Sequence, residues 1–120
     1  HVDVDDNISF GTSIGLQQYD PSTPDWTTYN IANYPDLVSD NIKVINNTIS
    51  ELWIGTDYGV SVFNEPTTWT TYNTTNGLGS NQVKSIDVDW SSSTDIWIGT
   101  NQGVSHFDGS SWISYSSPDL

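Results

Sequence analysis

The sequence predicts an all-β protein made of three copies of one structural unit, and two observations lead to this fold class. First, a Gly-Thr pair occurs three times at a spacing of 44 residues, and a second glycine follows each first glycine by four residues. Second, each copy ends with a Trp that has a Tyr three residues after it. The repeated positions are Gly11, Gly55 and Gly99; Gly15, Gly59 and Gly103; Trp26, Trp69 and Trp112; and Tyr29, Tyr72 and Tyr115. A period of about 40–50 residues is typical of repeat architectures.

Each unit is expected to form four short antiparallel strands. β-branched and aromatic residues occur in runs of roughly 4–7 between turn residues, and no window has the apolar stripe of a helix, so helix should be nearly absent. The strands expected in units two and three are 41–45 and 82–88, 52–56 and 96–100, 59–63 and 103–107, and 69–72 and 112–115. Asp57-Tyr58 and Asn101-Gln102 should close tight hairpins, with Asp or Asn and the following glycine at positive φ.

A repeated four-stranded unit of this size is typical of a β-propeller blade, because one small twisted sheet buries both of its faces only against neighbours. The repeat divides the chain into blades at residues 1–36, 37–77 and 78–120, the first with an incomplete first strand. Propellers usually close with four to eight blades. We therefore expect the three blades to be part of a larger or oligomeric propeller, with further blades of the same or another copy as partners.

Two segments carry a resemblance to a known family. The runs LWIGTDYGV at 52–60 and IWIGTNQGV at 96–104, with NGLGSNQVKSIDVD at 76–89 before the second, resemble the two-component regulator propeller repeat. The resemblance extends over all three units, although Ser9 stands in unit one where the others have Trp53 and Trp97. It implies an extracytoplasmic sensor domain of the kind that forms seven-bladed rings and often recognises glycan fragments.

Composition excludes several classes of function. The 120 residues have a net charge of −13, and Lys43 and Lys84 are the only lysines in a chain without arginine. Nucleic acid is therefore not an expected partner, and phosphoryl chemistry is disfavoured. The absence of cysteine excludes disulfides and thiolate zinc sites. No run approaches the roughly 20 apolar residues that span a bilayer, so membrane insertion is not expected. Because the chain begins at His1 and lacks Met, we interpret it as processed or as a fragment.

The candidate ligand-binding residues lie in the hairpins between second and third strands and in the connections between blades, which share one end of a propeller. Tyr, Asp, Asn and Gln vary there while the frame around them repeats. Aromatic rings stack on sugars, and amides and carboxylates bond to hydroxyls, so the mixture suits glycan recognition. The candidates are Asp57, Tyr58, Asn101, Gln102, Tyr34 and Asp36. The alternative is that Asp57 and Asn101 only form turns.

Catalysis and a resident cofactor are not expected. His1 and His106 have no Ser or Cys partner in a recognisable motif, and a glycosidase with two carboxylates stays open only as an alternative. Alternating aspartates offer hard oxygen ligands to Ca²⁺, but no known calcium-loop spacing accompanies them, and solvated carboxylates are the alternative. These pairs are Asp3 with Asp5 and Asp87 with Asp89.

The tryptophans are expected to pack rather than to bind ligands. Trp53 and Trp97 should lie in the core between blades, because the repeat places them in the same strand. Those of the fourth strand, Trp26, Trp69 and Trp112, should be partly buried, with docking of a neighbour as the alternative.

Three Asn-x-Ser/Thr sequons, at Asn7, Asn46 and Asn73, are candidates for glycosylation, although chance explains some of them in this composition. With the scarcity of basic residues they favour an extracellular, periplasmic or cell-surface location. Two functions stay open: a non-catalytic segment for ligand or protein recognition, with glycan sensing as one form of it, and a structural repeat unit of a surface layer, filament or adhesin built by blade-to-blade contacts.

Overall fold

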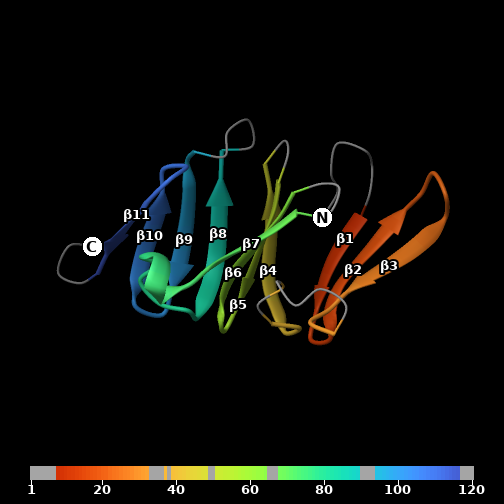
Figure 1. Ribbon diagram of the computed structural model, residues 1–120, viewed down its shortest axis with the longest axis horizontal. Helices are drawn as coiled ribbons and strands as arrows, with labels where there is room; N and C mark the ends of the chain where they lie inside the picture. Colours follow the sequence, from red (N-terminus) through yellow and green to blue (C-terminus); the bar gives the residue numbers. More distant parts are fainter. Residues whose placement is uncertain are drawn as a thin grey trace.

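The structure is a computed structural model, and it describes residues 8–32, 37, 39–48, 51–64, 68–89 and 94–116. These residues form three antiparallel sheets (Figure 1). Sheet 1 contains β1 (Ile8–Thr12), β2 (Gly15–Asp20) and β3 (Asp25–Tyr29). Sheet 2 contains β4 (Ile42–Asn47), β5 (Glu51–Thr56), β6 (Gly59–Asn64) and β7 (Thr68–Tyr72). Sheet 3 contains β8 (Val83–Val88), β9 (Ile96–Thr100), β10 (Gly103–Phe107) and β11 (Trp112–Tyr115).

The strand predictions for units two and three are confirmed to within two residues at each end. In the described part of the chain the helical content is one 3-10 turn, η1 (Thr74–Asn76), as the lack of helical periodicity indicated. In each sheet the strands pair in chain order. The fourth strand expected in sheet 1 falls in residues 1–7, outside the described residues. The blade boundaries at 36/37 and 77/78 stay predictions.

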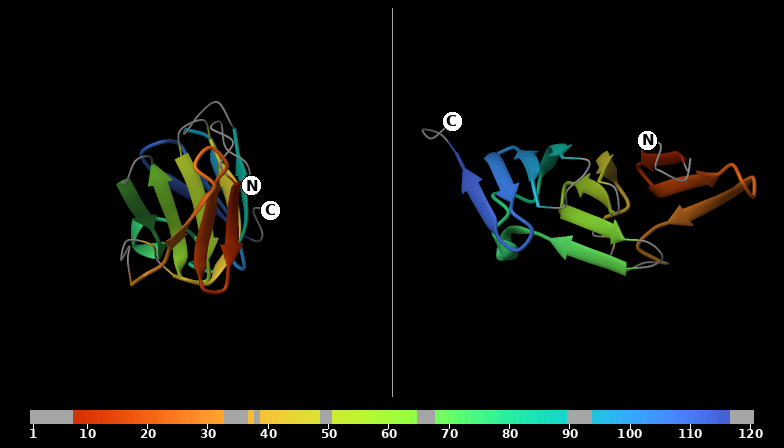
Figure 2. Two further views of the ribbon diagram at one scale, coloured as in Figure 1. Left: turned by 90° about the vertical axis from the view of Figure 1, so that its right-hand side faces the viewer. Right: turned by 90° about the horizontal axis from the view of Figure 1, so that it is seen from above.

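The three sheets stand side by side along the long axis of a 50 × 29 × 19 Å molecule, with sheet 2 between the other two (Figures 1 and 2). Their first strands are the elements in closest contact, since β4 lies beside β8 on one side and beside β1 on the other. Asn46 on β4 links two sheets directly, because its Nδ2 donates to the Ile86 carbonyl of β8 at 3.0 Å. The three described sheets form an open array and do not close into a ring.

The core consists of two layers, one in each gap between sheets. Between sheets 1 and 2 the buried residues are Leu16, Leu37, Ile42, Leu52, Ile54 and Phe63. Between sheets 2 and 3 they are Trp53, Val60, Val62, Leu78, Val83, Ile86, Ile96, Ile98 and Phe107. Successive side chains of a strand point to opposite faces, so β5 sends Leu52 and Ile54 into one layer and Trp53 into the other. This explains why the consecutive residues Leu52, Trp53 and Ile54 of β5 are all apolar instead of alternating with polar residues.

The first glycine of each repeat marks a close approach between strands. A Cβ on Gly55 would lie 2.5 Å from the Val83 Cγ1 of sheet 3 and 2.6 Å from the Val44 Cγ1 of its own sheet. A Cβ on Gly11 would meet the Ile42 side chain of sheet 2 in the same way. Glycine allows β1 and β5 to contact the first strand of the following sheet at these points.

The connection from β7 to β8 passes between sheets 2 and 3. Leu78 is 2% exposed and belongs to the same core cluster as Val60 of sheet 2. The backbone beside it is bonded to sheet 3, because Gly79 N donates to Ser105 Oγ at 2.9 Å and Ser114 Oγ donates to Gly77 O at 2.9 Å. The connection is thus an integral part of the interface between the two sheets.

The tryptophan predictions are confirmed for Trp53 and wrong for Trp97. Trp53 is 1% exposed between sheets 2 and 3, whereas Trp97, at the same place in the repeat, is 39% exposed. The difference arises because, among the described residues, no sheet packs against the face of sheet 3 that carries Trp97. Trp26 of sheet 1, which was expected to be partly buried, is 61% exposed for the corresponding reason at the opposite end of the array.

Candidate functional site

The hairpins β1–β2, β5–β6 and β9–β10 all lie at one edge of the array, the lower edge in Figure 1, and the connection through η1 reaches the same edge. We call this edge the hairpin edge. In each hairpin two residues separate the paired ends of the strands, namely Ser13 and Ile14, Asp57 and Tyr58, and Asn101 and Gln102. The structure therefore brings four predicted site residues to one edge.

The repeated threonine and second glycine hold each hairpin in shape. In sheet 2, Thr56 Oγ1 accepts from Tyr58 N at 3.0 Å and donates to Gly59 O at 3.0 Å. Thr12 and Thr100 make the same two bonds in their own hairpins. The second glycines Gly15, Gly59 and Gly103 have φ between 126° and 130°. These bonds involve no side chain of the two central residues.

The expectation that Asp57 and Asn101 supply positive φ is wrong, because among the described hairpin residues only the glycines have it. The threonine hydroxyl and the glycine produce the turn instead. Asp57 and Asn101 therefore do not provide the positive φ that the sequence led us to expect of them. Sequence reasoning identified the repeated Gly-Thr pair but did not assign this role to the threonine.

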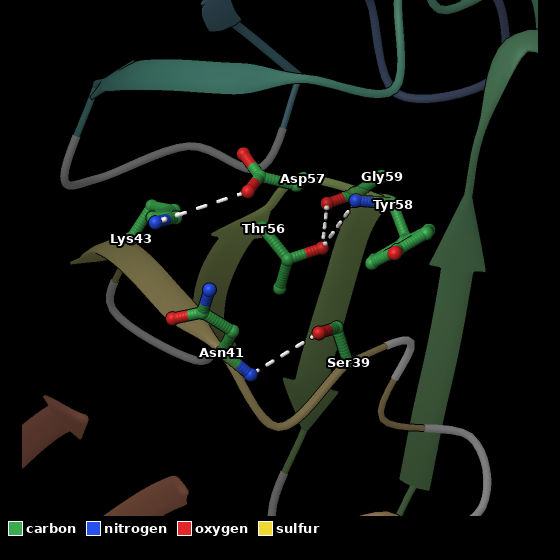
Figure 3. A network of polar contacts seen from close by, with 7 residues as sticks. All are labelled: Ser39, Asn41, Lys43, Thr56, Asp57, Tyr58 and Gly59. Carbon is green, nitrogen blue, oxygen red and sulfur yellow. Dashed lines mark hydrogen bonds and ion pairs between the residues drawn. The ribbon is translucent and has the colours of Figure 1, made fainter. Parts of the chain in front are cut away.

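The side chains of Asp57 and Tyr58 are accessible to solvent at the hairpin edge of sheet 2 (Figure 3). Asp57 Oδ2 lies 3.8 Å from Lys43 Nζ, and both side chains are partly exposed to solvent. Tyr58 is 65% exposed. Below this pair, Asn41 N donates to Ser39 Oγ at 3.1 Å and fixes the chain as it enters β4. The group combines an exposed ring, a carboxylate and an ammonium.

The corresponding group on sheet 3 is uncharged at the hairpin. Asn101 Oδ1 accepts from Ser80 Oγ at 2.6 Å, and Asn101 N donates to Gln82 O at 3.3 Å. The connection leading into β8 is therefore bonded to the β9–β10 hairpin. Gln102 is exposed. A cavity of about 210 Å³ opens beside it, with Gly103, Val104 and Tyr115 in its lining.

Several predicted site residues lie outside the described residues: Tyr34, Asp36, Asn7, Asp3 and Asp5. Of the other sequons, Asn46 is partly buried on β4 and its Nδ2 is used in the bond to Ile86. Asn73 caps η1, where its Oδ1 accepts from Thr75 N at 2.9 Å. The use of all three sequons stays a prediction.

The carboxyl groups with shifted pKa values are not at the hairpin edge. The pKa of Glu51, at the start of β5, is raised by burial, and the bond from the Trp53 indole partly offsets this shift. Bonds from the backbone N–H groups of Ser110 and Ser111 lower the pKa of Asp108 to about 2. Within the described ranges, no three His, Cys, Asp or Glu side chains are grouped as for a metal ion.

The comparisons with known proteins give a likeness in fold. No family model matches the sequence, and no curated protein matches it. Among solved structures, the chain is similar to the extracellular domain of a putative hybrid two-component system from B. thetaiotaomicron, with a TM-score of 0.80 and 22% identity. The match covers 96% of this chain but 17% of that chain. In the described part of this chain, no helix has the length and apolar character to cross a membrane.

Proposed function

We propose that this chain is a non-catalytic segment of an extracytoplasmic β-propeller, and that its hairpin edge recognises a glycan. The observation that carries the proposal is that, at this edge, the residues that form the turns differ from the residues whose side chains are exposed to a ligand. Repeated threonines and glycines form the turns, so the two central residues of each hairpin vary without loss of structure. Positions that vary on a constant frame are typical of binding surfaces.

The chemistry of the varying residues favours a neutral sugar. The Tyr58 ring is exposed for stacking on the C–H face of a pyranose, and Gln102 offers both a donor and an acceptor for hydroxyl groups. The net charge of −13 and the absence of arginine disfavour anionic polysaccharides. A neutral oligosaccharide that extends along the edge from one hairpin to the next is therefore the proposed ligand class.

The likeness to the extracellular domain of a two-component system supports an extracytoplasmic sensing role. The chain spans 17% of that chain, so the proposal concerns recognition alone and not the output of such a sensor. The resemblance of segments 52–60 and 96–104 to the two-component regulator propeller repeat agrees with this proposal.

The test is a glycan array followed by titration of the positive oligosaccharides, with amide NMR signals as the readout of location. Shifts should be concentrated at Asp57, Tyr58, Asn101 and Gln102. Tyr58→Ala should weaken binding about 10-fold, the scale of one lost stacking contact together with its buried area. Tyr58→Phe should retain most of the affinity if the ring face makes the contact.

Asn64→Ala is a matched control, because Asn64 is exposed at the other end of β6 in the same sheet and should leave affinity unchanged. A blank array together with no shifts on titration would refute the proposal. Shifts on the exposed face of sheet 3, with no effect of Tyr58→Ala, would place the ligand elsewhere and also refute it.

A further inference from the structure

The two ends of the array leave broad apolar faces uncovered. Sheet 3 exposes Trp97, Ile113 and Tyr115 on one face, and sheet 1 exposes Phe10 and Trp26 on the opposite side of the molecule. No described sheet lies against either face. Exposed apolar area of this kind in a folded protein usually marks an interaction surface.

The interior of the molecule shows how such faces meet. Tyr29, at the end of β3, projects from sheet 1 onto two rings of sheet 2. Its ring centroid lies 5.3 Å from that of Phe63 and 5.9 Å from that of Trp69. The two rings that receive it are themselves 4.7 Å apart.

The next interface repeats this contact. Tyr72, at the end of β7, projects from sheet 2 onto sheet 3, with its ring 5.1 Å from Phe107 and 5.5 Å from Trp112. The receiving rings are 4.9 Å apart. Trp53 joins the contact from the same side, stacked on Tyr72 and 5.7 Å from Phe107. A tyrosine on one sheet and a ring pair on the next thus form the repeated contact.

Both halves of a third contact are present, and within the part of the chain that the structure describes no sheet packs against either of them. Tyr115, at the end of β11, is the counterpart of Tyr72 and is 37% exposed, with Trp97 stacked near it at 6.2 Å. Tyr19 and Trp26 on sheet 1 are the counterparts of Phe107 and Trp112. Their rings are 5.0 Å apart, which matches the spacing of the two occupied ring pairs.

We propose that the exposed face of sheet 3 binds the exposed face of sheet 1 of a second copy of this chain. Tyr115 and Trp97 of one copy would then contact Tyr19 and Trp26 of the other, and the interface continues the stacking of sheets already present inside each chain. The two faces are different surfaces, so the contact is heterologous. Such contacts form rings where the rotation closes and open filaments where it does not.

Two polar groups of the sheet 3 face, the His106 ring and the Trp97 indole, are paired within the face, whereas Asp87, which lies beside Trp97 in the strand register, is exposed on the same face. His106 stands where sheet 2 has Val62, and its Nε2 lies 2.8 Å from Asp95 Oδ1. Trp97 Nε1 donates to the same oxygen at 3.2 Å. Because the His106 ring and the Trp97 indole already have a partner in Asp95, a second copy can cover these two groups without leaving either unpaired.

The same arrangement of Trp and acid is covered in sheet 2. There the Trp53 indole donates to Glu51 Oε1 at 3.4 Å beneath sheet 3. Near Tyr115, the cavity of about 210 Å³ is lined by Val104, the counterpart of Val60. Val60 shares its cluster with the buried Leu78 of the β7–β8 connection, so an apolar side chain fits against this position of the sheet.

The test measures the mass of the particle by analytical ultracentrifugation and native mass spectrometry over a wide range of concentrations. The wild type should form dimers or larger assemblies. Trp97→Ser introduces the residue that sheet 1 has at this position, Ser9, and Trp26→Ser removes the receiving ring. Each variant alone should weaken association about 30-fold or more, as for a buried aromatic anchor.

Mixing the two variants distinguishes a heterologous contact from a symmetric one. Trp97→Ser keeps an intact sheet 1 face and Trp26→Ser keeps an intact sheet 3 face, so the mixture should form a 1:1 heterodimer that grows no further. Ile14→Ser is the control, because Ile14 is exposed in a hairpin outside both faces. Circular dichroism checks the fold, and Tyr115→Ser with Phe10→Ser is the second pair if either tryptophan variant unfolds.

A wild type that stays monomeric at every concentration would overturn the proposal, as would variants that associate like the wild type or a mixture that does not pair. None of these results depends on a glycan. Failure of this proposal is therefore separable from failure of the proposed function.

Discussion

Trp53 and Trp97 provide an internal comparison, because the repeat places them at equivalent positions while one is 1% exposed and the other 39% exposed. A tryptophan buries roughly 150–250 Å², which at about 25 cal/mol per Å² corresponds to about 4–6 kcal/mol for a fully buried ring. By area alone Trp97 should contribute about three fifths of this value. Trp53→Ala also leaves a cavity between two sheets, which adds to its cost.

We therefore expect Trp53→Ala to lower the free energy of unfolding by about 2 kcal/mol more than Trp97→Ala does. The assay is urea unfolding followed by far-UV circular dichroism, at protein concentrations low enough to separate copies. Each indole donates to an acidic residue two positions earlier, so the loss of that bond nearly cancels in the comparison. Equal losses, or a larger loss for Trp97→Ala, would show that the burial of the two tryptophans does not differ as the structure indicates.

Three further substitutions or titrations test separate features. Gly55→Ala should destabilise the protein by about 1–3 kcal/mol, because the added Cβ overlaps Val83 and Val44; a thermal melt that is unchanged contradicts this. Burial raises the folded pKa of Glu51, so ionisation of this carboxyl opposes folding and the free energy of unfolding falls as pH rises through that pKa. Glu51→Gln should therefore be more stable than the wild type at neutral pH and should lose this advantage well below pH 4.5. Urea unfolding at the two pH values measures the difference. Asp108, with its folded pKa of about 2, stabilises the fold above its ordinary value of 3.8, and this contribution is lost as pH falls toward 2; an NMR titration with a midpoint near 3.8 would contradict the hydrogen-bond geometry.

The strands and hairpins could be predicted because the repeat is visible in single residues. The Gly-Thr pair, the second glycine and the strand tryptophan fix three turns and the direction of each side chain by the two-residue period of a strand. What periodicity cannot supply is the number of neighbouring sheets. The repeat correctly placed Trp97 in a strand, but it also assigned Trp97 to the core. Burial of this side chain requires another sheet against the outer face of sheet 3, which the repeat alone does not indicate.

The candidate site was predicted only in outline. The hairpin residues Asp57 and Tyr58 were located from turn chemistry, but the ion pair of Asp57 with Lys43 was not, since it depends on the pairing of β4 with β5 and on the irregularity between Ile42 and Val44. The bond between Ser80 and Asn101 likewise joins residues 21 apart in sequence, and no local pattern indicates it. The roles of Tyr34 and Asp36 stay predictions.

The β7–β8 connection determines how the molecule can come apart. Leu78 is buried with Val60 of sheet 2, while the adjoining Gly77 and Gly79 are bonded to β10 and β11. Separating sheet 2 from sheet 3 therefore either removes Val60 from this leucine or breaks both bonds between the connection and sheet 3. Local opening of either sheet is thermodynamically coupled to the other, and slow amide exchange should report them as one cooperative unit rather than two.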